Sequence, residues 1–172
     1  MNKIIMMALA LTIIGCSTAG VKNQEFTDFE KSTTLNISFD NAWGAVMEWA
    51  AINDYPIESV DKVSGIIVLR GSAVVSRSFM AEGDTAIEQV LVSCGDPTGN
   101  IGLYKGKFHD LDITTTVILR ELDSKLTRVT VNLRGDALVQ VRNLYGVVSE
   151  STVTCPSKGV LEEQMFSDLK AF

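Results

Sequence analysis

The chain has few of the residues from which catalytic and metal sites are built. Its 172 residues include one histidine and three cysteines, and no two cysteines form a CxxC pair. So few imidazoles and thiols cannot supply the usual zinc ligand sets, and no GxSxG motif provides the nucleophile of an α/β-hydrolase. His109 lies beside Asp110 and Asp112, but this group has no positioned nucleophile to activate. The sequence therefore predicts no catalytic residue, no metal ligand and no cofactor.

Clusters of basic residues are also missing. The chain has 15 Lys and Arg against 21 Asp and Glu, which gives a formal net charge of −6. Nucleic acids and anionic headgroups need a basic stripe that neutralises their phosphates, so no nucleic-acid partner is expected. The glycines of residues 95–102 precede no predicted helix, which a phosphate-binding loop requires. Glu162 and Glu163 are adjacent on a predicted helix, face different directions and are expected in solvent.

No apolar run reaches the roughly 20 residues that span a bilayer as a helix. Residues 4–14 follow Lys3 and are almost entirely apolar. Their last two residues begin the sequence Ile-Ile-Gly-Cys at positions 13–16. A short basic start, a core of this length and a small residue before the cysteine are typical of a secretion signal. The pattern resembles the lipobox of bacterial lipoproteins.

The lipobox resemblance implies where the mature protein resides. Residues 1–15 would be removed as a signal peptide, and Cys16 would carry acyl chains that hold the protein on the membrane. Ser17 follows the cysteine, which in this family implies the outer membrane. We expect the domain on the periplasmic side, and exposure at the cell surface is the alternative. Residues 16–32 show no clean periodicity and are predicted to form a lipidated tether.

The remaining chain predicts one domain with a disulfide. Removal of the signal leaves 172 − 15 = 157 residues, enough for a single domain at 33–172. Once Cys16 is lipidated, Cys94 and Cys155 remain as an even pair, which in an oxidising compartment predicts a disulfide. Two free thiols or a redox pair are the alternative, although no CxxC spacing supports it.

Hydrophobic periodicity predicts an α+β domain in which a curved antiparallel sheet packs on helices. The expected strands are 33–38, 57–60, 66–69, 111–119 and 126–134, and a further hairpin covers 135–154 with its turn near 143–146. The expected helices begin at Asp40 and at Ser157, each as the capping residue. Residues 84–92 fit a helix or a strand, with helix preferred, and 95–109 are expected to form a loop. The apolar face of the last helix is predicted from Leu161, Met165, Phe166, Leu169 and Phe172.

Two tryptophans on the first predicted helix suggest a contact surface. Trp43 and Trp49 are six residues apart, which places them about 120° from each other around a helix. We expect Trp43 in the core and Trp49 at an edge, where exposed aromatic area would suit a partner. The plainer alternative is that both side chains cover the sheet.

Residues 39–70 resemble the lipoprotein C family of the outer-membrane β-barrel assembly machinery. The shared order is a helix bearing tryptophan, a short strand, an Asp turn with glycine and an apolar strand, over about a fifth of the chain. The sequence from Cys155 to Glu162 also looks like the start of the last helix in small envelope lipoproteins. The resemblance implies a helix-grip fold, in which a curved sheet wraps a C-terminal helix.

These observations predict a non-enzymatic interaction or scaffold module at the outer membrane, which recruits an envelope protein through its sheet edge or the Trp49 region. The alternative is a carrier of an apolar ligand in a cavity between sheet and helix. An envelope hydrolase that uses His109 ranks last. The cavity of a carrier would be lined by Phe79, Met80, Phe108, Met165 and Phe166.

Overall fold

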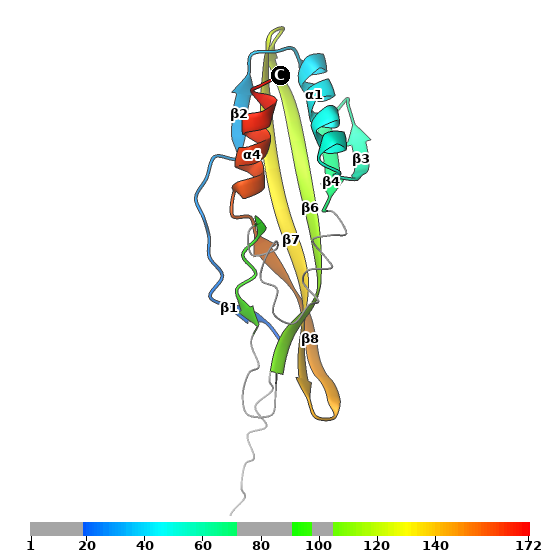
Figure 1. Cartoon of the computed structure of the whole chain (residues 1–172), viewed down its shortest axis with the longest axis vertical. Coiled ribbons are helices and arrows are strands. Elements are labelled where there is room, and N and C mark those ends of the chain that lie inside the picture. Colours follow the sequence, from blue (N-terminus) through cyan, green and yellow to red (C-terminus); the bar gives the residue numbers. More distant parts are fainter. Residues whose placement is uncertain (1–18, 72–90, 98–104) are drawn as a thin grey trace, which may run out of the picture.

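Two long antiparallel strands, β6 (Lys105–Asp123) and β7 (Leu126–Asn143), form the axis of the molecule (Figure 1). The computed structural model describes residues 19–71, 91–97 and 105–172. It is a single mixed α/β domain with an open, mostly antiparallel sheet and two described helices. The other elements are β1 (Val21–Lys22), β2 (Ser32–Leu35), α1 (Phe39–Ile52), β3 (Ile57–Asp61), β4 (Ile66–Arg70), β5 (Asp96–Pro97), β8 (Gly146–Pro156) and α4 (Val160–Leu169).

The main sheet has the strand order β2-β7-β6-β4-β3, and β8 also pairs with β7. Along one side of β7, residues 127–130 pair with β2 and residues 134–143 pair with β8. Both helices lie at the end of the molecule that carries β2, β3 and β4, whereas β8 extends to the opposite end (Figure 1). The helices therefore cover one half of the long β6–β7 hairpin.

The alternating strand pattern is confirmed. Leu111, Ile113, Thr115, Val117 and Leu119 are buried on β6, and the side chains that alternate with them are half-buried or exposed. Period-two burial arises because one face of the sheet packs on the core and the other meets solvent. The predicted hairpin of residues 57–60 and 66–69 is also present as β3 and β4. The predicted hairpin at 135–154 is present too, but its first arm is the continuation of β7.

The predicted caps of both helices are wrong. The α1 N-cap is Ser38, whose hydroxyl accepts a hydrogen bond from the Asn41 N–H at 3.4 Å. Asp40 instead lies in the first turn of α1. The α4 N-cap is Gly159, with φ of 86°, and a Cβ there would lie 2.6 Å from the ring of Phe29. Close packing and a left-handed backbone together require glycine at this position.

The predicted ends of two segments also differ from the structure. β6 begins at Lys105 and β5 occupies residues 96–97, so the expected loop of 95–109 is partly strand. The partner strand β7 extends to Asn143 and pairs with residues 105–108 despite their glycine, and residue 109 lies at a register shift. Phe172, expected on the apolar face of the last helix, is exposed beyond the end of α4. Residues 72–90, which hold most of the ambiguous 84–92 segment, lie outside the described residues.

The segment predicted as a tether is bound to the domain from Ala19 onward. β1 pairs with β5, the Gln24 side-chain amide donates to the Thr154 carbonyl at 2.7 Å, and the Val131 N–H donates to the Lys31 carbonyl at 2.9 Å. These bonds join the segment to the sheet and to residues 91–97. Individual side-chain and backbone contacts hold it, which explains why its sequence shows no periodicity.

Candidate functional site

Trp49 is a core residue, so the predicted partner contact at this position is wrong. Its side chain is 2% exposed, its ring stacks on Tyr55 with 5.3 Å between centroids, and its indole N–H donates to Asp168 at 2.9 Å. Burial raises the pKa of Tyr55. Trp43, expected in the core, is only half-buried beside Phe39. The other buried residues of α1 are alanines and Val46, and Trp49 is the residue that is hydrogen-bonded to α4.

The sheet edge was the other predicted contact surface. β3 is the described strand at one edge of the sheet, and β2 and β8 lie at the other. All five β3 side chains are exposed. Ile57 pairs with Leu69, and Val60 pairs with Ile67, with a bulge between Ile57 and Ser59. Directly paired residues share a face of the sheet, and Leu69 and Ile67 are fully buried in the core. Ile57 and Val60 therefore lie on the same face of the sheet as the core residues, but they remain exposed to solvent. The side chain of Val60 is 51% exposed.

The hydrogen-bond pattern shows which backbone groups of β3 face outward. The Arg70 N–H donates to the Pro56 carbonyl at 2.9 Å, and the Gly71 N–H donates to Ile113 on the other side. Backbone groups alternate along an antiparallel strand, so Val68 also faces β3 and pairs with Ser59. The N–H and C=O of Val60 consequently point away from β4. No described strand lies beyond them.

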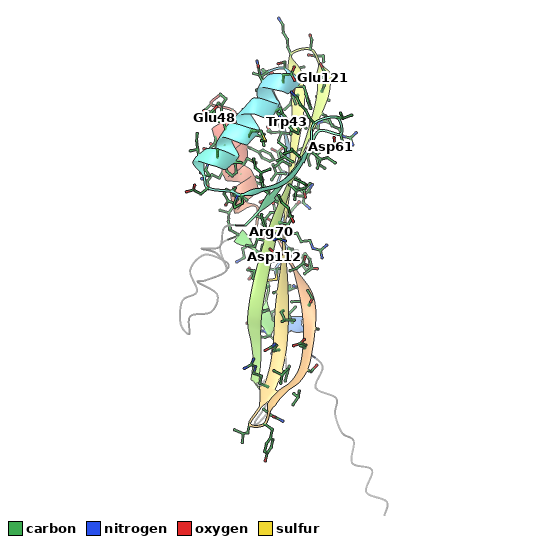
Figure 2. All side chains as sticks on the ribbon, turned by 90° about the vertical axis from the view of Figure 1, so that its right-hand side faces the viewer. Trp43, Glu48, Asp61, Arg70, Asp112 and Glu121 are labelled. Carbon is green, nitrogen blue, oxygen red and sulfur yellow. A yellow bond between two sulfur atoms is a disulfide. The ribbon has the colours of Figure 1, made fainter. Side chains whose placement is uncertain are left out.

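Charged side chains cross the solvent-facing side of the sheet. Arg70 on β4 contacts Glu58 on β3 at 3.5 Å and Asp112 on β6 at 3.6 Å. Figure 2 shows Arg70 and Asp112 midway along the molecule, away from the end that carries Trp43 and Asp61. All three charged groups are exposed, so their mutual stabilisation is small. Arg70 carries one positive charge against two carboxylates, so this group keeps a net negative charge, and Asp61 adds another at the end of β3.

Asp61 is ionised and held by the turn that follows β3. Its Oδ1 accepts hydrogen bonds from the N–H groups of Val63 and Ser64, both at 3.1 Å. Hydrogen bonds from Ser64, chiefly from its side chain, lower the pKa of Asp61. The β3 edge thus presents two apolar side chains and a fixed negative charge.

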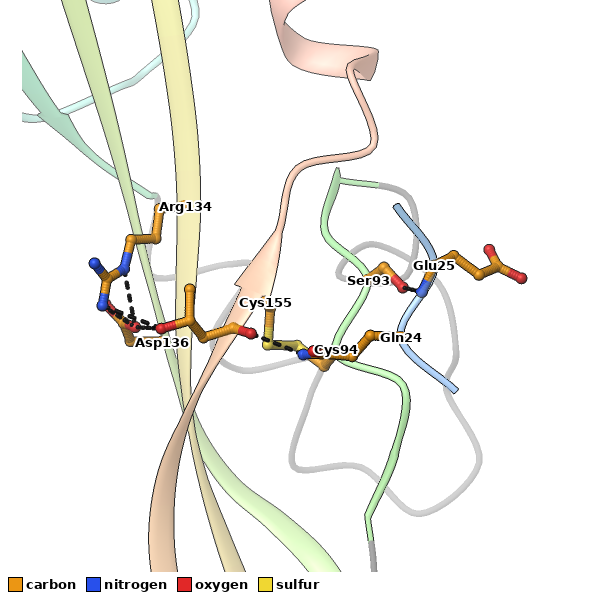
Figure 3. The surroundings of a disulfide bond; sticks show 8 residues. Gln24, Glu25, Ser93, Cys94, Arg134, Asp136 and Cys155 are labelled. Atoms are coloured by element: carbon orange, nitrogen blue, oxygen red, sulfur yellow. Dashed lines mark hydrogen bonds and ion pairs between the residues drawn. A yellow bond between two sulfur atoms is a disulfide. The ribbon is translucent and has the colours of Figure 1, made fainter. Parts of the chain in front are cut away.

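The predicted disulfide is present in the structure, between Cys94 and Cys155 (Figure 3). It attaches residues 91–97 to β8, and the Ser93 hydroxyl on that segment accepts the Glu25 N–H at 2.8 Å. The N-terminal segment therefore rests on a strip of chain that the disulfide holds against the sheet. Cys155 is fully buried, as a structural cystine is.

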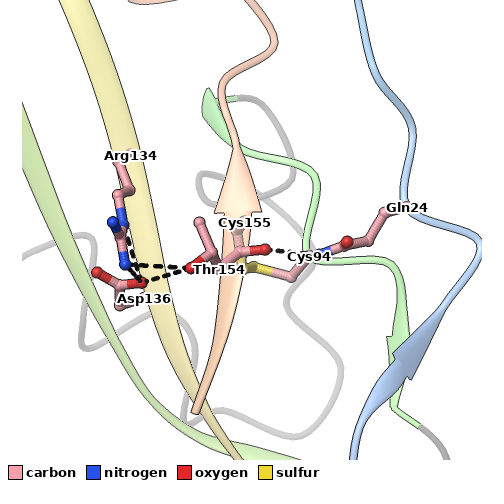
Figure 4. A network of polar contacts seen from close by, with 6 residues as sticks. All are labelled: Gln24, Cys94, Arg134, Asp136, Thr154 and Cys155. Atoms are coloured by element: carbon pink, nitrogen blue, oxygen red, sulfur yellow. Dashed lines mark hydrogen bonds and ion pairs between the residues drawn. A yellow bond between two sulfur atoms is a disulfide. The ribbon is translucent and has the colours of Figure 1, made fainter.

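A polar network lies on the sheet next to the disulfide (Figure 4). The guanidinium of Arg134 donates to Asp136 at 2.7 and 3.0 Å, and the Thr154 hydroxyl donates to the same oxygen at 3.0 Å. The Arg134 hydrogen bond is the main reason why the pKa of Asp136 is lowered. These contacts connect β7 to β8. They lower the pKa of the carboxyl group and so do not prepare it to act as a general base.

Glu162 is buried, contrary to the prediction that it lies in solvent. It is 1% exposed, and its carboxylate accepts hydrogen bonds from the Ser157 hydroxyl at 2.9 Å and the Leu133 N–H at 3.3 Å. Leu133 lies between the part of β7 that pairs with β2 and the part that pairs with β8. Glu162 thus supplies the acceptor that neither strand provides. No local pattern signals this role, because Leu133 is 29 residues away.

An open cavity of about 260 Å³ lies beside Glu162. It is bounded by the N-terminal segment, β7 and the end of β8. Both oxygens of Glu162 are engaged inside the protein, so the carboxylate is a structural acceptor and not a free base. The lining residues are Phe26, Thr27, Phe29, Lys31, Asn132, Leu133, Arg134, Thr154, Cys155, Pro156, Ser157 and Glu162.

The residues predicted to line a ligand cavity do not form one in the described part of the chain. Met165 and Phe166 are buried within the hydrophobic core, and Phe108 packs against it. Phe79 and Met80 lie outside the described residues. Three of the five predicted lining residues therefore belong to the packed interior of the described part of the chain.

The described residues offer no further chemistry of the kinds considered. The backbone of His109 lies in β6, but its side chain lies outside the described residues, as does the predicted lipidation site Cys16. Within the described ranges, no three His, Cys, Asp or Glu side chains come together as a metal site. In the same ranges, no helix is both long and apolar enough to cross a membrane.

Comparisons of the chain with protein-family models, curated proteins and solved structures gave no match.

Proposed function

We propose that this chain is a non-enzymatic lipoprotein of the bacterial outer membrane that binds an extended segment of an envelope protein along β3. Residues 1–15 act as the signal peptide, and Cys16 carries the acyl chains of the anchor. The resemblance to the lipoprotein C family implies a helix-grip architecture, and an open antiparallel sheet with two described helices supports that part of the proposal.

The outward backbone of β3 is the observation that supports this function. An edge strand with free N–H and C=O groups can accept a further strand, and backbone hydrogen bonds then provide most of the affinity. The Val60 groups point away from β4, and the side chains of Ile57 and Val60 extend the apolar layer of the core. The sequence predicted two contact surfaces, the sheet edge and the Trp49 region. Because Trp49 is buried, the sheet edge remains.

The chemistry of the edge defines the partner. An added strand would place an apolar side chain opposite Val60, where it would cover the half-exposed layer. Asp61 remains ionised at the end of the strand, so the partner segment carries Lys or Arg near that position. The expected ligand is therefore a short extended segment with alternating apolar residues and a basic residue at one end.

Substitutions at Val60 test the proposed strand addition. Val60→Pro removes the outward N–H while the pairing of Ser59 and Asp61 with β4 is kept, because proline is tolerated on an edge strand whose N–H faces solvent. Val60→Thr keeps the N–H and serves as the control. In purifications of the native acylated protein, we expect a stoichiometric envelope protein with the wild type and Val60→Thr, and at least about tenfold less with Val60→Pro.

Photo-crosslinking locates the contact on the captured protein. A photoreactive residue in place of Glu58 lies on the edge, whereas the same residue in place of Arg120 is exposed on the face of β6. We expect crosslinks to one extended peptide from position 58 and none from position 120. Equal capture by Val60→Pro and Val60→Thr, or equal crosslinking from both positions, would contradict the proposal.

A further inference from the structure

The turn between β7 and β8 exposes apolar side chains at the end of the molecule opposite α1 and β3 (Figure 1). Leu144 is 78% exposed and Tyr145 is 96% exposed, and Val147 and Val148 are each half-exposed. We call these four residues the tip patch. The patch lies within an uncharged stretch, since residues 144–149 contain no Asp, Glu, Lys or Arg.

The turn holds the tip patch in a defined shape. The Asn143 side-chain oxygen accepts the Tyr145 N–H at 2.8 Å, and Gly146 adopts φ of 130°, which a residue with a side chain rarely does. Asn143 and Gly146 are paired across the hairpin, so only two residues form the turn. The ladder therefore presents Leu144 and Tyr145 outward, away from any core.

The N-terminal segment enters the described structure beside the tip patch. The Ala19 N–H donates to the Ser149 hydroxyl at 3.2 Å, and the Ser151 hydroxyl donates to the Ala19 carbonyl at 2.8 Å. Ser149 directly follows Val148 of the patch. Three residue steps separate Ala19 from Cys16, and an extended chain covers at most about 3.6 Å per residue. The proposed lipid anchor therefore lies within roughly 11 Å of Ala19, which is bonded to the residue next to the tip patch.

We propose that the tip patch inserts into the surface layer of the same membrane that holds the acyl chains of Cys16. This inference rests on the proposed lipidation. Exposed apolar area gains by leaving water, and tyrosine suits the interface because its ring is apolar and its hydroxyl stays hydrated. Along the hairpin, the first charged residues on either side of the patch are Arg142 and Glu150, so insertion of the turn itself buries no charge of the hairpin. Acyl chains and tip patch then form two contacts that fix the orientation of the domain.

Fluorescence quenching by brominated lipids tests this contact. The variant Y145W places an additional indole at the tip, and L122W places one at an exposed position near the opposite end, on β6. Each acylated protein is reconstituted into phosphatidylethanolamine–phosphatidylglycerol vesicles, with or without bromine on the upper acyl chain. Trp43 and Trp49 contribute equally to both variants. We expect the bromolipid to remove most of the added emission of Y145W and none of that of L122W.

The possible failures have different signatures. Acylation is measured by mass spectrometry on the same preparations, and an unacylated protein would overturn both the proposed function and the insertion of the tip. An acylated, vesicle-bound protein with equal quenching in Y145W and L122W would overturn the insertion alone. If that protein also dimerised with concentration and lost this property in Tyr145→Asp, the patch would be an interface between two copies of the chain.

Discussion

Removal of the Glu162 carboxylate should destabilise the domain strongly, because the carboxylate completes the hydrogen bonding of a buried strand. β7 changes its neighbour from β2 to β8 between residues 130 and 134. Within this interval the Val131 N–H is bonded to the Lys31 carbonyl, and the Leu133 N–H is bonded to Glu162. Glu162→Ala leaves the Leu133 N–H and the Ser157 hydroxyl without their acceptor.

The expected loss follows from these two groups. A buried donor that loses its acceptor costs about 1–3 kcal/mol, and a hydrogen bond to the second donor contributes about 1 kcal/mol. We therefore expect Glu162→Ala to lower the free energy of unfolding by about 2–4 kcal/mol. Glu162→Gln keeps one acceptor oxygen but turns an NH₂ group toward a donor, so its loss should be about 1–2 kcal/mol.

Glu163→Ala is the matched control, because Glu163 is exposed and lies in the same first turn of α4. Both substitutions remove one negative charge from the helix N-terminus, so the helix dipole contributes equally to the two variants. Urea unfolding with the disulfide intact measures the free energies, and hydrogen exchange measures the protection of the Leu133 amide. A Glu162→Ala variant within about 0.5 kcal/mol of Glu163→Ala, or unchanged protection at Leu133, would refute this reasoning.

Three further changes test other parts of the structure. Serine at both Cys94 and Cys155, which are 61 residues apart, should lower stability by about 4 kcal/mol in urea unfolding. Thr115→Val should raise stability by about 1 kcal/mol in thermal unfolding, because the buried Thr115 hydroxyl has no partner within the described ranges. Arg134 lowers the pKa of Asp136, so the Asp136 carboxylate stabilises the fold at neutral pH, and this contribution is lost as pH falls through the lowered pKa. Asp136→Asn should therefore have a lower urea midpoint than the wild type at pH 7, and the difference should shrink on acidification below about pH 4.

The strands of the sheet could be predicted because one face of the sheet packs on the core and the other face meets water. From Leu111 to Leu119, every second residue is buried, and the same period appears in the sequence. The first residues of β6 could not be predicted in this way. Residues 105–109 are strand because β7 continues beside them, and that pairing is not encoded in their own composition.

The candidate sites were less accessible to sequence reasoning than the strands. On α1, the buried residues are small ones together with Trp49, whereas the prediction placed Trp43 in the core and Trp49 at an edge. Helical spacing could not decide between the two tryptophans, because the acceptor of the buried indole N–H, Asp168, lies on α4. At β3, a spacing of three between Ile57 and Val60 breaks the strand period. That spacing is the local signal of the bulge that places both side chains on one face.

The two proposed contacts lie on one continuous ladder, which fixes the distance between them. β4 pairs with β6 at Thr114–Ile118, and these residues pair with 130–134 on β7. From the middle of that interval to Leu144 is twelve residues, or about 40 Å at the rise of an extended strand. A free tether of residues 16–32 would let the domain tumble, but Ala19 and the chain that follows it are bonded to the sheet. With the tip patch in the membrane surface, the β3 edge would stand about 40 Å from the bilayer, in reach of periplasmic segments of a membrane protein and clear of the lipid headgroups.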